Sequence, residues 1–231
     1  MELKVIGRIH TDFSSKFGIP RQSGLVEELP GTIVFEPEYR NADAVRGLEE
    51  FSHLWLIWEF SEAVRKDWSP TVRPPRLGGN KRLGVFATRS PFRPNPIGLS
   101  CVRLDRIVLE TARGPVLQVS GVDMMDGTPI YDIKPYLSYT DSHPNASGGF
   151  TDHIVSHPMK VVMPKEQCYA SGLSAEKLEA IRDVLGQDPR PRYQQDPDRI
   201  YGMSFAAREV RFRVQGDTVY VTEISDEAGG R

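Results

Sequence analysis

The chain has 231 residues and a mass of 26.0 kDa, and its 29 Lys and Arg against 31 Asp and Glu give a net charge of −2. This balance excludes a globally basic nucleic-acid-binding domain, and two isolated cysteines exclude a disulfide framework and a paired-cysteine metal site. No apolar run approaches the ~20 residues of a membrane span, and the N-terminus lacks an apolar signal core. We therefore expect a cytoplasmic protein without membrane contact.

The first part of the chain consists mainly of strand-like runs. They are rich in Val, Ile, Leu and Phe and are separated by Gly, Pro and Asp, which is typical of strands joined by turns. A short helix is expected at Ala42–Glu50, after Asn41 as its cap. Strands and helices do not alternate, which argues against a doubly wound parallel sheet and favours a mainly β fold with a small antiparallel barrel. The predicted strands are KVIGRIH (4–10), GTIVFEP (31–37), HLWLIWEF (53–60), LGVFATRS (83–90), LSCVRLDRIVLE (99–110), VLQVSGV (116–122) and PIYDIKP (129–135).

A polar, turn-rich stretch at Ser142–Gly149 is the predicted boundary between two parts. Beyond it, MKVVMP predicts a strand, and residues of about 174–187 predict a helix with Ser174 as the N-cap. Two strands at about 208–223 are joined by a Gly-containing turn, which indicates a hairpin. We therefore expect a β-barrel domain over 1–141 and a smaller α+β domain over 150–231.

The segment GVFATRSPFRPNPIGLS (84–100) carries the densest chemical pattern. Three prolines fix the backbone and push their preceding residues toward extended geometry, so the arginine and asparagine side chains are held at defined positions. Arginine forks suit phosphate or carboxylate, and an asparagine amide can recognise an adenine edge. A Pro-rich loop between strands with solvated arginines is the alternative interpretation.

This segment closely resembles the TrmO family, also called the YaeB or UPF0066 family. Further pieces match in the family's order over about the first 140 residues, and DPRPRY (188–193) resembles the family's appended region. These pieces are IPRQSGL (19–25), NADAVRGLEEFSHLWLIWEF (41–60), TVRPPRLGGN (71–80) and DMMDGTPIYDIKPYL (123–137).

The resemblance implies an S-adenosylmethionine-dependent enzyme that methylates N6 of threonylcarbamoyladenosine, next to the anticodon of a threonine tRNA. It also implies a homodimer and a barrel outside the Rossmann methyltransferases. The absence of a GxGxxG motif after a strand agrees with the last point.

By resemblance, the cofactor pocket maps onto four segments: residues 20–22 in the first loop, residues 61–62 after the strand at 53–60, Arg89 and Leu99 in the Pro-rich segment, and residues 123–126. A carboxylate there can accept ribose hydroxyls or pair with the cofactor's amine, and an arginine can hold its carboxylate. The Asp-Gly pair at 126–127 also suits a plain turn, and the pair at 61–62 varies in the family, so it can contribute through its backbone alone. The predicted cofactor-binding residues are Pro20, Arg21, Gln22, Ser61, Glu62, Arg89, Leu99, Asp123, Met124, Met125 and Asp126.

Methyl transfer to N6 needs in-line alignment and the loss of a proton at some stage. Asp132 can accept that proton or orient Lys134, Lys134 can stabilise negative charge, and Asn95 and Tyr136 complete the predicted catalytic set. A strand-edge ion pair is the alternative for Asp132 and Lys134.

RNA contact is expected from a basic stretch without acidic residues and from the C-terminal loop, because anticodon loops offer unstacked bases. Trp68 is exposed by context and could stack on RNA, whereas Trp55 and Trp58 suit a core or a dimer interface. The widely spaced histidines do not predict a metal site. The predicted RNA-binding residues are Arg73, Arg76, Lys81, Arg82, Arg93, Arg190, Arg192 and Tyr193.

Two other functions remain open from the residues: a non-catalytic regulator that binds the cofactor or RNA, and a methyltransferase on the same barrel that acts on a small molecule. The basic stretch and the DPRPRY segment favour RNA over a small molecule as the partner.

Overall fold

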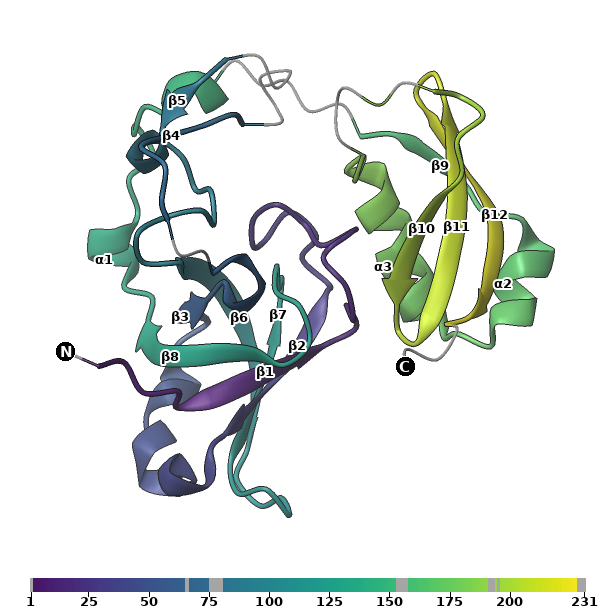
Figure 1. Ribbon diagram of the computed structural model, residues 1–231. Coiled ribbons are helices and arrows are strands. Elements are labelled where there is room, and N and C mark those ends of the chain that lie inside the picture. The colour runs from purple at the N-terminus through teal and green to yellow at the C-terminus, as the bar shows by residue number, and fades with distance from the viewer. Residues whose placement is uncertain are drawn as a thin grey trace.

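A closed antiparallel barrel forms the first part of the chain in the computed structural model, which describes residues 2–64, 67–74, 81–152, 158–190, 194 and 196–227. The strand order is β1-β2-β7-β6-β3-β8, and β8 pairs with β1 to close the barrel (Figure 1). This confirms the predicted mainly β fold with a small barrel. The barrel strands are β1 (Gly7–Thr11), β2 (Pro30–Phe35), β3 (His53–Glu59), β6 (Ile97–Val108), β7 (Val116–Ser120) and β8 (Thr128–Pro135).

Strand β3 shows how the sequence sets the two faces of the barrel. Leu54, Leu56 and Trp58 are buried, whereas the alternate residues are only partly covered. Side chains of a strand alternate between faces, so the three buried residues point into the barrel. Trp55 and Ile57 therefore lie on its outer face.

The stretch between β2 and β3 differs from the prediction. The helix expected at Ala42–Glu50 is wrong: Asn41 does cap a turn by accepting a hydrogen bond from the Asp43 amide, but Gly47 adopts φ +88° and separates two 3-10 turns. Left-handed glycine ends a helical segment, which explains the break. The 3-10 helices are η1 (Pro37–Tyr39), η2 (Ala42–Val45), η3 (Leu48–Glu50), η4 (Ser61–Ala63), η6 (Val85–Ala87) and η7 (Gly149–Thr151).

The strand expected at 83–90 is also mostly wrong. Only β5 (Leu83–Gly84) is extended, paired with β4 (Thr71–Val72), and η6 follows it directly. Arg93 stabilises this turn, because its guanidinium donates to the carbonyls of Val85 (3.2 Å) and Thr88 (2.6 Å). A short ribbon therefore projects from the barrel in place of a further barrel strand.

A second sheet, ordered β10-β11-β12-β9, forms the C-terminal part, with β9 parallel to β12. Ser174 accepts a hydrogen bond from the Lys177 amide and begins α3, as expected of an N-cap, and α1 and α2 were not predicted. None of the helices in the described stretches has the length and apolarity to cross a membrane. The elements are α1 (Ser138–Asp141), β9 (Lys160–Val162), α2 (Lys165–Ser171), α3 (Ala175–Gly186), β10 (Tyr201–Phe205), β11 (Arg208–Gln215) and β12 (Thr218–Asp226).

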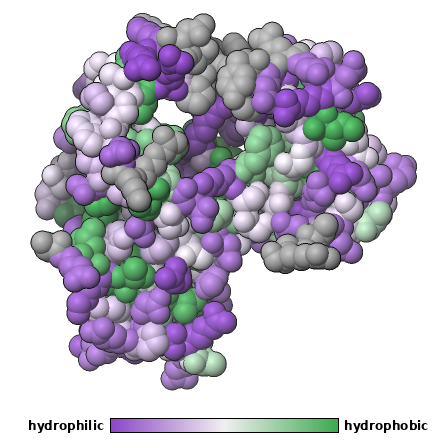
Figure 2. Space-filling view, viewed as in Figure 1, coloured by the Kyte–Doolittle hydropathy of each residue, from purple (hydrophilic) through white to green (hydrophobic). Residues whose placement is uncertain are grey.

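The loop after β1 packs against the C-terminal sheet. The rings of Phe13 and Phe205 lie 5.2 Å apart edge to face, and Lys177 forms an ion pair with Asp12. In the space-filling view the surface is hollowed between the two parts (Figure 2). Because each part has its own sheet, we propose two domains at 1–141 and 150–231 that meet through this loop.

Candidate functional site

The first loop, the Pro-rich segment and the turn after β7 meet at one end of strand β6. The Ser23 hydroxyl accepts a hydrogen bond from the Cys101 amide (3.1 Å), and the Gly24 amide donates to the Gly121 carbonyl (2.9 Å). The Arg89 guanidinium donates to the side-chain oxygen of Gln22. These contacts bring together three of the four segments that were predicted to bind the cofactor.

Asp123 is the most buried charged group of this cluster. Its Oδ1 accepts a hydrogen bond from the Ser100 hydroxyl (2.6 Å), which in turn accepts one from the Trp58 indole (2.9 Å). Burial raises the pKa of Asp123 to about 6, although the Ser100 hydroxyl, the Ser23 backbone and the Arg89 charge all lower it. Its charge is therefore only partly compensated, and a cationic or hydrogen-bond-donating ligand would favour the ionised form.

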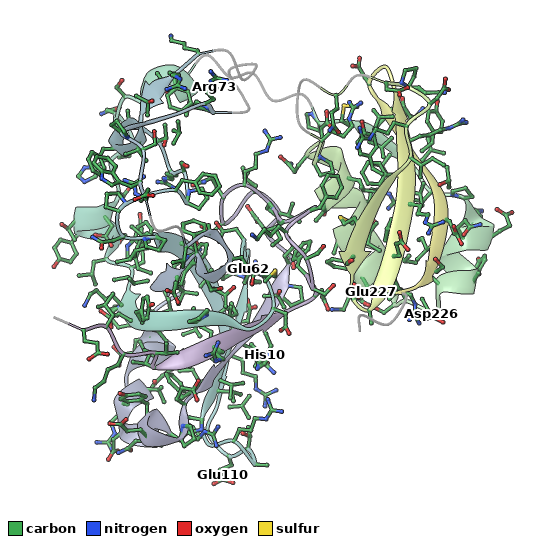
Figure 3. All side chains as sticks on the ribbon, viewed as in Figure 1. His10, Glu62, Arg73, Glu110, Asp226 and Glu227 are labelled. Atoms are coloured by element: carbon green, nitrogen blue, oxygen red, sulfur yellow. The ribbon has the colours of Figure 1, made fainter. Side chains whose placement is uncertain are left out.

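The fourth segment, at η4, is joined to the first loop by Lys16. The Lys16 ammonium donates to the Glu62 carbonyl oxygen (2.9 Å) and lies 3.8 Å from the Glu62 carboxylate. Ser61 is the first residue of η4, and Figure 3 shows Glu62 between the barrel and the first loop. Lys16 was not predicted, because a lone lysine in a loop carries no chemical pattern.

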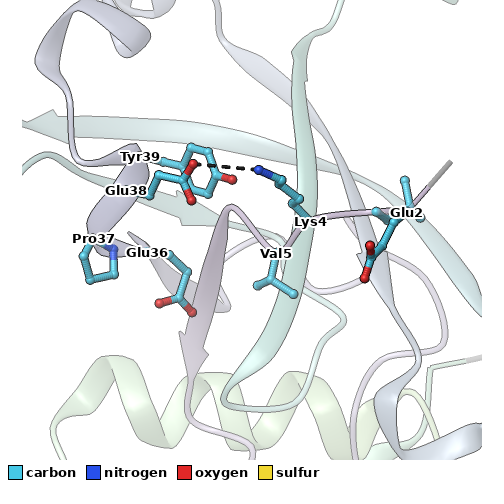
Figure 4. Close-up of a pocket in the computed structure, with 8 residues that line it drawn as sticks. Glu2, Lys4, Val5, Glu36, Pro37, Glu38 and Tyr39 are labelled. Carbon is cyan, nitrogen blue, oxygen red and sulfur yellow. Dashed lines mark ion pairs between the residues drawn. The ribbon is translucent and has the colours of Figure 1, made fainter.

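Pro20 and Arg21 line a small cleft of about 110 Å³ between the first loop and the end of α3. The Arg21 guanidinium donates to the backbone carbonyl of Arg190 (3.3 Å), so it links the loop to the C-terminal part. A second cavity, of about 600 Å³, lies between residues 2–5 and 36–39 (Figure 4). Its lining contains none of the predicted site residues, so we do not assign the cofactor to it.

The remaining predicted cofactor residues lie in different surroundings. Met124 is fully buried in the core, whereas Met125 is partly covered. Asp126 accepts a hydrogen bond from the Thr11 amide and lies 3.1 Å from His10 Nδ1, so it also performs the turn role left open for the Asp-Gly pair. Leu99 is 53% exposed on the outer face of β6 and offers apolar surface.

The predicted catalytic pair lies on the outer face of β8. The Lys134 ammonium is 2.9 Å from the Asp132 carboxylate, and both side chains are largely exposed. Asp132 is aligned with Ile57 of β3, which is aligned with Leu99 of β6. Neighbouring strands lie ~4.8 Å apart, so Asp132 and Leu99 share one face about 10 Å apart.

The other two predicted catalytic residues flank this face. The Tyr136 ring packs against those of Trp55 and His53 at 5.8 and 6.2 Å between centroids, next to Lys134. Asn95 is exposed two residues before β6, where its carbonyl accepts from the Ile97 amide. Among the described residues no hydrogen bond joins Asn95 to the Asp132–Lys134 pair.

The predicted RNA-binding residues that the structure describes lie at the β4–β5 ribbon and the turn after it, or in the C-terminal loop. Arg93 belongs to the first group, but its guanidinium already donates to the Val85 and Thr88 carbonyls. Arg73, Lys81 and Arg82 flank the β4–β5 ribbon, and no described acidic residue forms an ion pair with them. Figure 3 shows Arg73 at the ribbon, far from His10 on β1. Arg190 instead holds Asp188 with two hydrogen bonds (2.8 and 3.1 Å), so an RNA phosphate would have to displace that carboxylate. Arg76, Arg192 and Tyr193 lie outside the described residues.

Sequence reasoning did not assign a role to Ser23 or Ser100, and it placed Trp58 only in a core or a dimer interface, not in the chain of hydrogen bonds that reaches Asp123. Both serines lie inside family-like segments, IPRQSGL and GVFATRSPFRPNPIGLS, and this was the available signal. A serine hydroxyl has no distinctive spacing, so only the fold reveals its partner.

Comparison with known proteins extends over both parts of the chain. A model of the tRNA-methyltransferase O N-terminal domain matches residues 8–142, and a model of the TrmO C-terminal domain matches residues 158–227. The chain is 43% identical over 220 residues to the tRNA (adenine(37)-N6)-methyltransferase of Escherichia coli, which covers 92% of this chain and 93% of that protein.

Two further comparisons agree. The chain is 40% identical to a putative S-adenosylmethionine-dependent methyltransferase, RcsF, of Pseudomonas aeruginosa, with 97% and 96% of the two chains covered. A crystal structure of TrmO from the same species superimposes with a TM-score of 0.78 at 33% identity, covering 98% of this chain and 97% of the other.

Proposed function

We propose that this chain, which belongs to the tRNA-methyltransferase O family, transfers a methyl group from S-adenosylmethionine to N6 of an adenosine next to the anticodon of a tRNA. This proposal rests on the 43% identity, over 92% of the chain, to a tRNA (adenine(37)-N6)-methyltransferase. We further propose threonylcarbamoyladenosine, in a threonine tRNA, as the acceptor, and such a substrate implies a cytoplasmic reaction.

The residues around Asp123 suit S-adenosylmethionine. A buried carboxylate with a raised pKa can receive the cofactor's ammonium group or its ribose hydroxyls. The Arg89 guanidinium can bind the cofactor's carboxylate, and Gln22 beside it can position that guanidinium. Leu99 offers apolar surface for the adenine ring. When bound, the cofactor supplies an electrophilic methyl group on a positively charged sulfur.

The Asp132–Lys134 pair suits the proton step of the reaction. The Asp132 carboxylate can accept the proton that N6 loses or hold the Lys134 ammonium in place, and the ammonium can stabilise the negative charge that develops on the acceptor. Tyr136 directly follows β8, and its ring packs on that of Trp55, which supports this end of the face. We propose these residues, with Asn95, as the acceptor side of the site.

A homodimer is part of the same proposal. Ile97 and Leu99 expose 37% and 53% of their surface on the outer face of β6, beside the half-covered Trp55 and Ile57 of β3. A second copy on this face would bury apolar area and exclude water from the Asp132–Lys134 pair.

Mass spectrometry of nucleosides tests the function directly. Bulk tRNA incubated with the purified chain and labelled S-adenosylmethionine should gain one methyl group on threonylcarbamoyladenosine. If the label appears on another adenosine, the acceptor assignment is wrong. If the cofactor binds but no nucleoside gains a label, a regulator or a small-molecule methyltransferase becomes the better interpretation.

Replacing Lys134 with Ala should lower the transfer rate about 100-fold while leaving cofactor affinity unchanged, because general acid–base and charge-stabilising groups contribute roughly 10²–10⁴-fold. Single-turnover methylation of tRNA measures the first quantity, and calorimetric titration with S-adenosylmethionine measures the second. Lys4, which also forms an exposed ion pair but lies at the N-terminal cavity, provides the matched Lys→Ala control. Equal rates for both variants would assign the Asp132–Lys134 pair to surface structure alone.

A further inference from the structure

Two aromatic side chains at the β4–β5 ribbon are far more exposed than aromatic residues usually are. Trp68 is 53% exposed and Phe86 is 71% exposed, and their ring centroids lie 6.2 Å apart at 29°. Aromatic side chains normally bury most of their area. A pair this exposed contributes little to the stability of the folded chain, so its aromatic surface is available to a ligand.

The ribbon fixes the backbone that carries this pair. The Val85 amide donates to the Pro70 carbonyl (2.9 Å), which fixes the chain beside Trp68 against the turn that carries Phe86. Val85 is fully buried and anchors η6, while Phe86 next to it points outward. The Arg93 guanidinium, pinned by its hydrogen bonds to this turn, lies 5.7 Å from the centre of the Phe86 ring. The backbone positions of the two rings are therefore set before a ligand binds.

The surroundings are cationic. The sequence from Trp68 to Leu104 contains no Asp or Glu, and Arg73, Lys81 and Arg82 flank the ribbon. Arg82 is held by the Thr71 hydroxyl at 3.2 Å. A flat aromatic surface framed by arginine and lysine complements a nucleotide. Every base has a π-face that can stack on the rings, and every phosphodiester linkage carries a negative charge that can pair with the cations. An apolar protein partner would not need the cations.

We propose that Trp68 and Phe86 form a platform on which an unpaired base of the RNA substrate stacks, with the neighbouring cations contacting its phosphates. This rests on the proposed tRNA-methylating function and adds the side chains that recognise the single-stranded loop. Base–aromatic stacking does not depend on sequence, so the platform favours unpaired over paired nucleotides without selecting a particular base.

Fluorescence anisotropy with a labelled anticodon stem-loop RNA tests the platform. Trp68→Ala and Phe86→Ala should each weaken loop binding about 10-fold, because each removes one ring on which a base stacks. Trp68→Phe, which keeps a ring, should retain most of the affinity. A blunt RNA duplex of equal charge should bind all variants alike, because its bases are unavailable. Tyr169→Ala, which removes an 82% exposed aromatic from α2, is the matched control.

The outcomes separate this inference from the function on which it rests. If the wild-type chain binds the stem-loop and the Ala variants bind it equally well, the platform is wrong and the function stands. If the wild-type chain binds no RNA, both are wrong. If the variants keep RNA affinity but lose self-association in sedimentation, the pair belongs to a protein interface and the platform is overturned. Equal circular dichroism and equal duplex binding exclude misfolding as the cause of a loss.

Discussion

Replacing Asp123 with Asn should weaken S-adenosylmethionine binding. It should also raise the stability of the folded chain, relative to the wild type, more at neutral pH than at acidic pH. The two effects have one cause: a carboxylate is kept in a largely buried position where its charge is only partly compensated. The change preserves the size of the side chain and removes the charge. The Ser100 hydroxyl can still reach the side-chain oxygen of Asn.

The sign of the stability effect follows from the pKa of Asp123. In the folded chain this pKa is about 6, above the ordinary aspartate value of 3.8, so between these values the folded state binds more protons than the unfolded state. The protonated Asp123 side chain therefore contributes to the free energy of unfolding below about pH 4. This contribution, roughly 3 kcal/mol in total, is lost as the pH rises through about 6. The Asn variant lacks this loss.

Urea unfolding at pH 4 and pH 7.5 measures the effect. The unfolding free energy of Asp123→Asn minus that of the wild type should increase by about 2–3 kcal/mol between the two pH values. Asp105→Asn is the matched control, because Asp105 also accepts a hydrogen bond from a serine hydroxyl, that of Ser120, but is partly exposed. A difference that stays constant with pH would contradict the buried, raised-pKa description of Asp123.

Cofactor affinity should depend on the same carboxylate. If ionised Asp123 receives a cationic or hydrogen-donating part of S-adenosylmethionine, only the ionised fraction binds well, so affinity at pH 5 should be about tenfold lower than at pH 7. The Asn variant should bind more weakly at pH 7 and lose this dependence. Calorimetric titration at both pH values checks the prediction, and tight, pH-independent binding by the variant would remove Asp123 from the cofactor site.

Replacing Gly98 with Ala should destabilise the barrel by about 3 kcal/mol, at the upper end of overpacking costs. An added Cβ would lie 2.2 Å from Cε2 and 2.5 Å from Cζ2 of Trp58. Trp58 is only 6% exposed, packs on Phe60 at 4.2 Å between ring centroids and donates to Ser100, so its rigid ring cannot move aside freely. A loss of this size is a large share of typical domain stability.

Thermal unfolding checks this second prediction, with an expected fall in the midpoint of roughly 6–12 °C. Gly84→Ala is the matched control, because its Cβ would meet no atom within 4 Å and its φ of −56° suits any residue. In a Trp58→Phe background the cost of Gly98→Ala should shrink, since the smaller ring leaves room for the methyl group. Equal midpoints for the Gly98 and Gly84 variants would show that the indole ring does not rest on the Gly98 backbone as described.

The sequence alone determined the features that depend on neighbouring residues. The alternation in HLWLIWE predicted strand β3, the runs at 99–110 and 129–135 predicted β6 and β8, and Ser174 marked the start of α3. Local propensity and capping act over a few residues, so they can be recognised along the chain. The family-like segments likewise pointed to the chemistry, because their residues are contiguous.

The tertiary structure decided what depends on residues far apart in sequence. Asp123 is largely covered where Ser100 and Ser23 meet it at the end of β6, and the donors of Arg93 are turned inward onto the 85–88 turn. The break at Gly47 replaced the expected helix with two short turns, since the chain must cross between barrel strands there. Burial, pKa and availability for a ligand arise from contacts that only the closed barrel brings together, and no local pattern encodes them.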